Sequence, residues 1–197
     1  MKKLQALVAV AGLLVAGSAF AQGAPDKGKA APPPAAAPAK PPEAPMVPKA
    51  AAEMDQMKGM IGTWKCDGKM TGAGMDMPIK STYKVAWDMD NMWLVGHLEG
   101  AKSKMMPRAY KAVDYYTYDP GKKEYVKLSV DNMGGGGRAT YKGWEGDKQG
   151  WDGKTMMMGG EMDDKTVITR KGDKEVELEI KSSGGGHDMA ETITCKR

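Results

Sequence analysis

Alternation of apolar and polar residues dominates the chain beyond Gly62 and limits it to a β fold. Between residues 79 and 88 the apolar and polar residues separate largely by parity, with Ile79, Tyr83, Val85 and Trp87 on one parity and Lys80, Thr82, Lys84 and Asp88 on the other. Residues 175–181 repeat the pattern without an exception. A period of two is that of a β-strand with one face toward water. The sequence therefore predicts strands rather than helices over most of its length.

Turn-forming residues recur about every ten positions and divide this region into short segments. They bound about ten candidate strands: 63–70, 78–89, 92–100, 109–118, 123–131, 138–145, 148–156, 161–170, 174–182 and 188–196. Only residues 50–62 have a helical pattern, with Met54, Met57 and Ile61 spaced three and four apart before Gly62. The prediction is an all-β antiparallel meander after one short N-terminal helix. Closure into a barrel is favoured because a closed sheet has no exposed edges.

The two cysteines provide a test of closure. Cys66 and Cys195 lie on the apolar faces of the first and last predicted strands, which a closed barrel places side by side. We expect a disulfide between them in an oxidising compartment, with two buried free thiols as the alternative. A zinc or redox site is disfavoured because the cysteines do not form a Cys-x-x-Cys pair.

The N-terminal residues predict export. Lys2 and Lys3 precede a short apolar run, and Ala19-Phe20-Ala21 is typical of a cleavage site, so residues 1–21 are interpreted as a signal peptide. Residues 22–49 contain nine of the twelve prolines and many alanines, which predicts a disordered linker. Residues 50–197 form the expected domain. We expect a periplasmic or secreted protein without an integral membrane span after processing.

Charge argues against nucleic acid as a partner. The formal net charge of the whole chain is +4, but residues 50–197 contain equal numbers of basic and acidic residues. A nucleic-acid-binding domain carries a basic excess to contact phosphates. The sequence leaves the oligomeric state open.

Several segments, taken in order, resemble a known family. A short helix running into Met60-Ile61-Gly62-Thr63-Trp64, followed by Asp90-Asn91-Met92-Trp93-Leu94, resembles the start of lipocalin-like (calycin) barrels. With Tyr115-Tyr116-Thr117-Tyr118-Asp119-Pro120 and the ending Glu191-Thr192-Ile193-Thr194-Cys195-Lys196-Arg197, the chain is similar to the bacterial domain-of-unknown-function 1579 family. The resemblance implies a ten-stranded up-and-down barrel with a helix near one end. It implies no established activity and no catalytic residues.

The expected core is rich in methionine. Residues 50–197 contain 16 Met, four Leu and no Phe. Unbranched, polarizable side chains repack around ligands of varied shape, so a Met- and aromatic-lined interior favours a small hydrophobic ligand. The candidate pocket residues are Trp64, Tyr83, Trp87, Tyr110, Tyr115 and Tyr125. The alternative is a structural or interaction module whose side chains fill the barrel.

Metal binding is a second alternative, and otherwise no cofactor is expected. Thioethers bind monovalent copper or silver, and Met70, Met75 and Met77 flank a glycine-rich turn where they could converge. His187 is the single candidate for an axial haem ligand, whereas His97 is expected on a solvated strand face.

Catalytic motifs are missing from the sequence, so we expect a protein that is not an enzyme. There is no Gly-x-Ser-x-Gly motif, and two histidines leave little scope for a Ser-His-Asp triad. The run Gly134–Gly137 before Arg138 lacks the lysine of a phosphate-binding loop and is interpreted as a hairpin loop near the barrel mouth.

Overall fold

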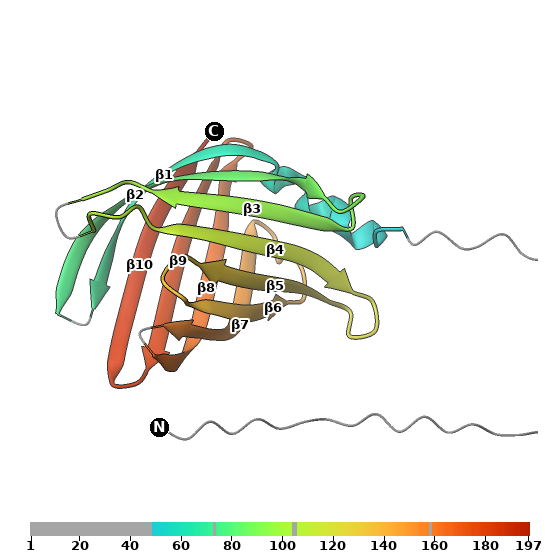
Figure 1. Cartoon of the computed structure of the whole chain (residues 1–197). Coiled ribbons are helices and arrows are strands. Elements are labelled where there is room, and N and C mark those ends of the chain that lie inside the picture. The colour runs from blue at the N-terminus through green and yellow to red at the C-terminus, as the bar shows by residue number, and fades with distance from the viewer. Residues whose placement is uncertain (1–48, 73, 104–105, 158) are drawn as a thin grey trace, which may run out of the picture. The chain divides into compact units, whose positions relative to one another are not determined.

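Ten antiparallel strands and one short helix make up the folded part of the chain (Figure 1). The structure, a computed structural model, describes residues 49–72, 74–103, 106–157 and 159–197. The elements are η1 (Ala52–Met60), β1 (Gly62–Gly72), β2 (Met75–Asp88), β3 (Trp93–Gly100), β4 (Lys111–Asp119), β5 (Glu124–Asp131), β6 (Gly136–Tyr141), β7 (Lys148–Met157), β8 (Gly160–Gly172), β9 (Glu175–Gly184) and β10 (His187–Lys196).

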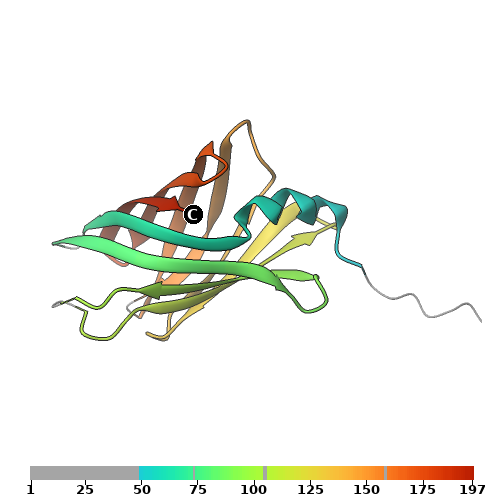
Figure 2. The ribbon, with the colours of Figure 1, turned by 90° about the horizontal axis from the view of Figure 1, so that it is seen from above.

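The sheet closes on itself. Each strand pairs with its neighbour in sequence, and β1 pairs with β10 to complete the barrel, with Cys66 directly opposite Cys195. The prediction of an all-β, ten-stranded up-and-down barrel with one short helix is confirmed. Helix η1 lies at one end of the barrel (Figure 2), which we call the helix end. The opposite end, where β1 and β3 finish and β2 and β4 begin, is called the mouth.

The helix is shorter and tighter than its sequence pattern suggested. It is a 3-10 helix of nine residues, and Ile61 lies beyond it as the C-cap. Its two buried residues, Met54 and Met57, are three apart. In a 3-10 helix, residues i and i+3 lie above one another, so this spacing places both side chains on the barrel.

Strand β6 differs most from its predicted range. It begins at Gly136 and ends at Tyr141, so half of the glycine run expected in a loop belongs to the strand. A Cβ atom at Gly137 would lie 2.6 Å from the carbonyl oxygen of Lys154 on β7, which explains why glycine is required there. The hairpin turn is held instead by Asp131, whose Oδ1 accepts the N–H groups of Met133 and Gly135, each at 2.8 Å.

Strand β5 has the reverse of the usual barrel polarity. Its outward side chains are Val126, Leu128 and Val130, and its inward ones are Tyr125, Lys127, Ser129 and Asp131, as their register with β4 and β6 requires. Opposed residues on antiparallel strands share a face, so the inward assignment follows from the pairing of Ser129 with Asp114 and of Tyr125 with Tyr118. The interior of the barrel is therefore partly polar and part of its exterior is apolar.

The predicted signal peptide (1–21) and most of the predicted linker (22–49) lie outside the described residues. Within the part that the structure describes, no helix is long and apolar enough to cross a membrane.

Candidate functional site

The helix end of the barrel is filled by its own side chains. Met57 is completely buried and Trp151 is 2% exposed. The rings of Tyr125 and Tyr141 stack with their centroids 4.4 Å apart, and the centroids of the Tyr141 and Trp151 rings are 4.2 Å apart. The Tyr125 hydroxyl donates to the backbone oxygen of Glu53 at 2.8 Å, which ties η1 to the barrel. These packed side chains form a plug at this end of the barrel.

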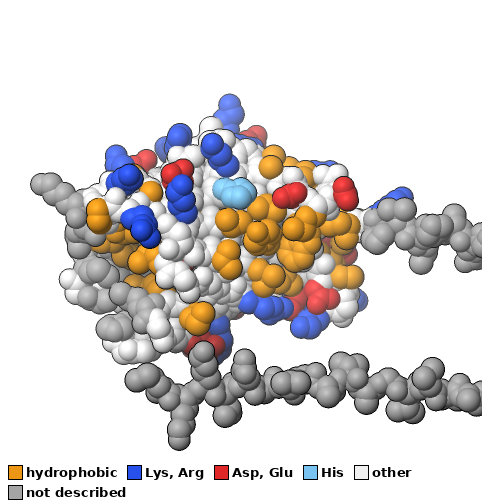
Figure 3. Space-filling model, in the orientation of Figure 1, with side chains coloured by type: hydrophobic (Ala, Val, Ile, Leu, Met, Phe, Trp, Pro, Cys, Tyr) orange, Lys and Arg blue, Asp and Glu red, His pale blue; other side chains and the backbone are white. Residues whose placement is uncertain are grey.

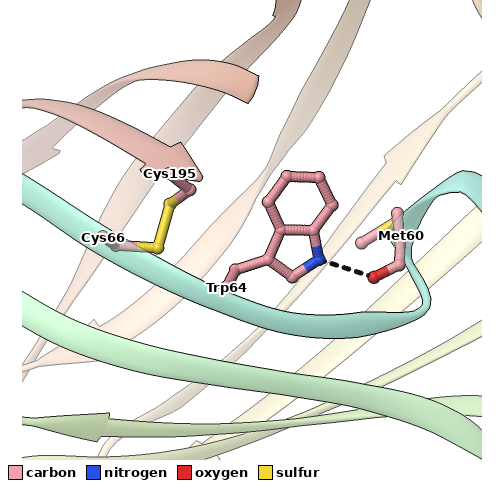
Figure 4. Close-up of a disulfide and its surroundings, with 4 residues drawn as sticks. All are labelled: Met60, Trp64, Cys66 and Cys195. Atoms are coloured by element: carbon pink, nitrogen blue, oxygen red, sulfur yellow. Dashed lines mark hydrogen bonds between the residues drawn. A yellow bond between two sulfur atoms is a disulfide. The ribbon is translucent and has the colours of Figure 1, made fainter. Parts of the chain in front are cut away.

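The seam between the first and last strands lies beside this plug. Cys66 and Cys195 form a disulfide there, as predicted (Figure 4). Trp64, two residues before Cys66 on β1, donates its indole N–H to the backbone oxygen of Met60 at 2.8 Å. The Trp64 hydrogen bond therefore holds the end of η1 against the seam that the disulfide closes.

A hydrogen-bonded network lines one wall of the interior between plug and mouth. The Tyr83 hydroxyl donates to Asp114 Oδ2 at 2.9 Å and lies 2.8 Å from the Tyr116 hydroxyl. Ser129 donates to the other oxygen of Asp114 at 2.7 Å. Burial, followed by the negative charge of Asp114, raises the pKa of Tyr83 and of Tyr116 well above the usual 10, so both remain neutral donors. The Tyr83 hydroxyl hydrogen is already engaged in the hydrogen bond to Asp114. In the pair of hydroxyls, Tyr116 is therefore the donor and Tyr83 the acceptor.

A second polar group comes from β8, β9 and β10. Ser182 donates to Asp164 Oδ1 at 2.8 Å, and Thr166 lies 3.4 Å from the other oxygen. Glu191 points to the interior from β10, opposite Ile180. Burial, and then the charge of Asp164, raises the pKa of Glu191 above its ordinary value. The interior therefore offers hydrogen-bonding groups from two sets of strands.

Apolar side chains between these groups are not fully covered. Ile79, Leu98 and Ile180 all point into the barrel, yet each is only half-buried. Ile79 and Ile180 also pack against the buried core. The upper half of the barrel therefore places partly exposed apolar residues beside oriented hydroxyls and carboxylates.

Methionines and a tyrosine occupy the mouth. Met70 and Met77 are directly opposed on β1 and β2 and point inward. The Tyr110 hydroxyl lies 3.3 Å from Asp131 Oδ2, and burial, followed by that carboxylate, raises the pKa of Tyr110. Among the described residues no group of three or more His, Cys, Asp or Glu side chains is placed to hold a metal ion.

The structure separates the predicted pocket residues into three places. Trp64, Trp87 and Tyr125 belong to the core around the plug, whereas Tyr83 and Tyr110 line the upper interior. Tyr115 was wrongly assigned to the interior: it points outward and packs against Trp93 at 6.4 Å, since its register partners are Val95 and Leu128.

The two histidines and Met75 lie on three different strands. His97 is exposed on the outer face, as expected. His187 begins β10, and Met75 begins β2. The side chains of both lie outside the part that the structure describes.

Sequence analysis missed the residues that supply most of the interior polarity. These are Asp114, Tyr116, Ser129, Asp164, Ser182 and Glu191. On β4, parity misleads because Val113 and Tyr115 on one face are more apolar than Asp114 and Tyr116 on the other. Only the register shows that the more polar face is the inner one.

Comparison with known proteins supports the barrel assignment. The family model described as "Protein of unknown function (DUF1579)" matches residues 49–196. A search of curated proteins found no match. Among solved structures, the S-type phycobiliprotein lyase CPES from Guillardia theta is similar, with a TM-score of 0.52 and 9% identity over 75% of this chain and 97% of that one. Rv2717c from M. tuberculosis gives a TM-score of 0.55 and 11% identity over 76% of this chain and 100% of that one. At these identities the similarity establishes the fold alone.

Proposed function

The chain belongs to the DUF1579 family of unknown function, and from this barrel's geometry we propose that it binds a small hydrophobic molecule in the upper half of the interior. The observation that carries the proposal is the half-buried state of the inward-facing Ile79, Leu98 and Ile180. Ligand pockets combine apolar walls with a few placed polar groups. Tyr83, Asp114 and their partners would orient a polar substituent of the ligand.

The plug at the helix end supports entry of the ligand from the opposite end. The helix end is closed by η1 and the aromatic side chains, so the ligand would enter through the mouth, past Met70 and Met77. Flexible methionines at an entrance adapt to ligands of different shape.

The disulfide supports action in an oxidising compartment after export. Sequencing the N-terminus of the exported protein tests the predicted cut after Ala21.

A matched pair of alanines tests the pocket. Ala112 points inward from β4, opposite Leu98, whereas Ala190 is exposed on the outside of β10. We expect Ala112→Phe to lower the affinity for the neutral dye Nile red about tenfold or more by filling the pocket, and Ala190→Phe to leave it unchanged. Circular dichroism would verify that both variants are folded. Equal affinity in the two variants, or no binding by the parent chain, would contradict the proposal.

A catalytic role is not part of the proposal. One structural neighbour is by its name a phycobiliprotein lyase, but at 9% identity it shares only the fold. That the barrel acts without catalysis stays a prediction, to be tested by incubating any identified ligand with the protein and measuring its mass afterwards.

Soft-metal binding at the mouth is a second candidate function. It is favoured by the direct opposition of Met70 and Met77, with Glu191 on the other side of Met70. Thioethers select monovalent copper and silver. Calorimetric titration with Ag(I) should show binding that is lost in Met70→Leu/Met77→Leu and retained in Met89→Leu, whose side chain is 55% exposed in the β2–β3 turn at the helix end. Retained binding in the double variant would exclude this site.

A further inference from the structure

The outer surface of the barrel has one apolar face, carried by β3, β4 and β5. The register aligns nine outward positions in three rows of three, which we call the outer face: Trp93, Thr117 and Val126; Val95, Tyr115 and Leu128; His97, Val113 and Val130. Seven of the nine residues are apolar and none is Asp, Glu, Lys or Arg. Figure 3 shows hydrophobic side chains gathered over these strands.

The other strands do not share this character. The outward residues of β9 include Glu175, Glu177, Glu179 and Lys181, and those of β1 include Lys65, Asp67 and Lys69. The exterior of the barrel is therefore polar on one side and apolar on the other. Folding of the barrel alone does not require this difference. Contiguous exposed apolar surface with a polar rim is typical of an interaction site.

Exposure shows which residues are available for contact. Val130 is 54% exposed and Leu128 is 38% exposed, whereas Val95, although outward, is only 5% exposed. The Trp93 and Tyr115 rings meet edge to face at 6.4 Å. The outer face is therefore a packed aromatic and aliphatic surface, with the exposed valine and leucine at its β5 side.

We propose that the outer face is the interface of a homodimer, in which a second copy of this chain packs face to face about a two-fold axis across the central row. An isologous interface requires a surface complementary to itself. Rotation about an axis through Val95, Tyr115 and Leu128 places the first row over the partner's third row. Each apolar row then meets an apolar row, and sheets packed face to face keep their strands nearly aligned.

Charges around the outer face fit the same rotation. On β2, Ala86 pairs with Val95 and so lies on the central row, which leaves Lys84 and Asp88 two residues away on either side. Each Lys84 would therefore lie over Asp88 of the other copy. On β4, Lys111 and Asp119 are likewise equally distant from Tyr115 and are exchanged by the rotation. Both pairs bring opposite charges together. Arg138 on β6 pairs with Leu128 and so lies on the central row, where the rotation brings it near Arg138 of the second copy; Glu124, 3.4 Å from this guanidinium, offsets its charge.

Area is consistent with a stable dimer. The three strands of the outer face, at about 4.8 Å spacing and about eight residues of roughly 3.3 Å each, cover roughly 400 Å², and the flanking strands β2 and β6 extend the contact to roughly 600 Å². A standard interface buries about 800 Å² on each partner, counted over side-chain contours rather than a flat area. A shallow hollow of about 310 Å³, bounded in part by Lys84, Val95 and His97, borders the face and could accept side chains of the second copy.

Sedimentation of the processed chain tests the proposal, and two matched positions provide the control. Leu128 and Val167 are 38% and 37% exposed on the outside of different strands. We expect a dimer at about 200 μM, a dimer dissociation constant raised about 100-fold by Leu128→Asp, and no change with Val167→Asp. A monomeric parent chain, or equal effects of the two substitutions, would overturn the proposal.

Charge reversal tests the axis without relying on Leu128. Lys84→Asp would face Asp88 of the second copy and weaken the dimer, and adding Asp88→Lys in the same chain should restore it. A double variant as weak as the single one would overturn the proposed arrangement. The outer face does not line the barrel interior, so Nile red binding by monomeric Leu128→Asp would separate this proposal from the ligand proposal.

Discussion

Gly96→Ala is expected to disrupt the polar wall of the interior through a single methyl group. Gly96 lies on β3 between Val85 and Asp114 in the register, and an added Cβ would overlap the hydroxyl oxygen and Cζ of Tyr83 and lie 2.7 Å from its Cε2. Tyr83 would have to move and give up its hydrogen bonds to Asp114 and Tyr116. Overpacking costs about 1–3 kcal/mol and each lost hydrogen bond about 1 kcal/mol. Since movement of the ring relieves part of the overlap, we expect a loss of about 2–4 kcal/mol in the free energy of unfolding.

A double-mutant cycle with Tyr83→Leu isolates this contact. Leucine is too short to reach the added methyl group, so in the Tyr83→Leu background Gly96→Ala should cost less than about 1 kcal/mol, and alanine's better strand propensity could reverse its sign. Urea unfolding followed by tryptophan fluorescence measures all four proteins. An equal cost of Gly96→Ala in both backgrounds would show that Gly96 serves the strand backbone rather than Tyr83, and would refute the reasoning.

Three further predictions concern the seam, the interior acid and the plug. The disulfide Cys66–Cys195 closes a loop of 129 residues, so reducing it should lower the free energy of unfolding by about 3–5 kcal/mol, seen as a shift of the urea midpoint with and without reductant. Burial and a neighbouring aspartate raise the pKa of Glu191 above 4.5, so the folded chain holds that proton more tightly than the unfolded chain and loses stability as pH rises through this range. Glu191→Gln should therefore raise Tm near neutral pH, and the difference in Tm between the variant and the parent chain should vanish below about pH 4. A difference in Tm that does not depend on pH would contradict the raised pKa of Glu191. Tyr125→Phe removes the bond to the backbone of Glu53 and should cost about 1 kcal/mol, with greater protease sensitivity of the segment before β1.

The fold could be predicted from the sequence because its signals are local. Turn residues separate the strands, and β9 alternates without an exception over residues 175–181, so its inner and outer faces follow from parity alone. Cys66 and Cys195 then test closure, since their predicted strands are neighbours only in a closed barrel. Each of these inferences needs no knowledge of tertiary packing.

The site was less predictable because β4 and β5 lack that simple relation between parity and burial. On β5, binary patterning favours turning Val126, Leu128 and Val130 inward, yet the register turns them outward. The deciding information is the offset between strands, which depends on side chains distant in sequence, such as Tyr83 meeting Asp114 from 31 residues away. Tyr115 was assigned to the interior for the same reason, whereas the register places Tyr116 there.

The reversed polarity of β5 connects the two proposals physically. Turning Ser129 and Asp131 inward costs free energy unless each finds partners, and both do: Ser129 bonds Asp114, and Asp131 bonds Tyr110 and the hairpin turn. Turning Leu128 and Val130 outward leaves apolar surface in water, which a second copy would cover. A single register therefore creates a polar interior wall and an apolar exterior at once. Because adjacent residues of one strand serve the two faces, substitutions at odd and even positions of β5 should affect ligand binding and dimerisation separately.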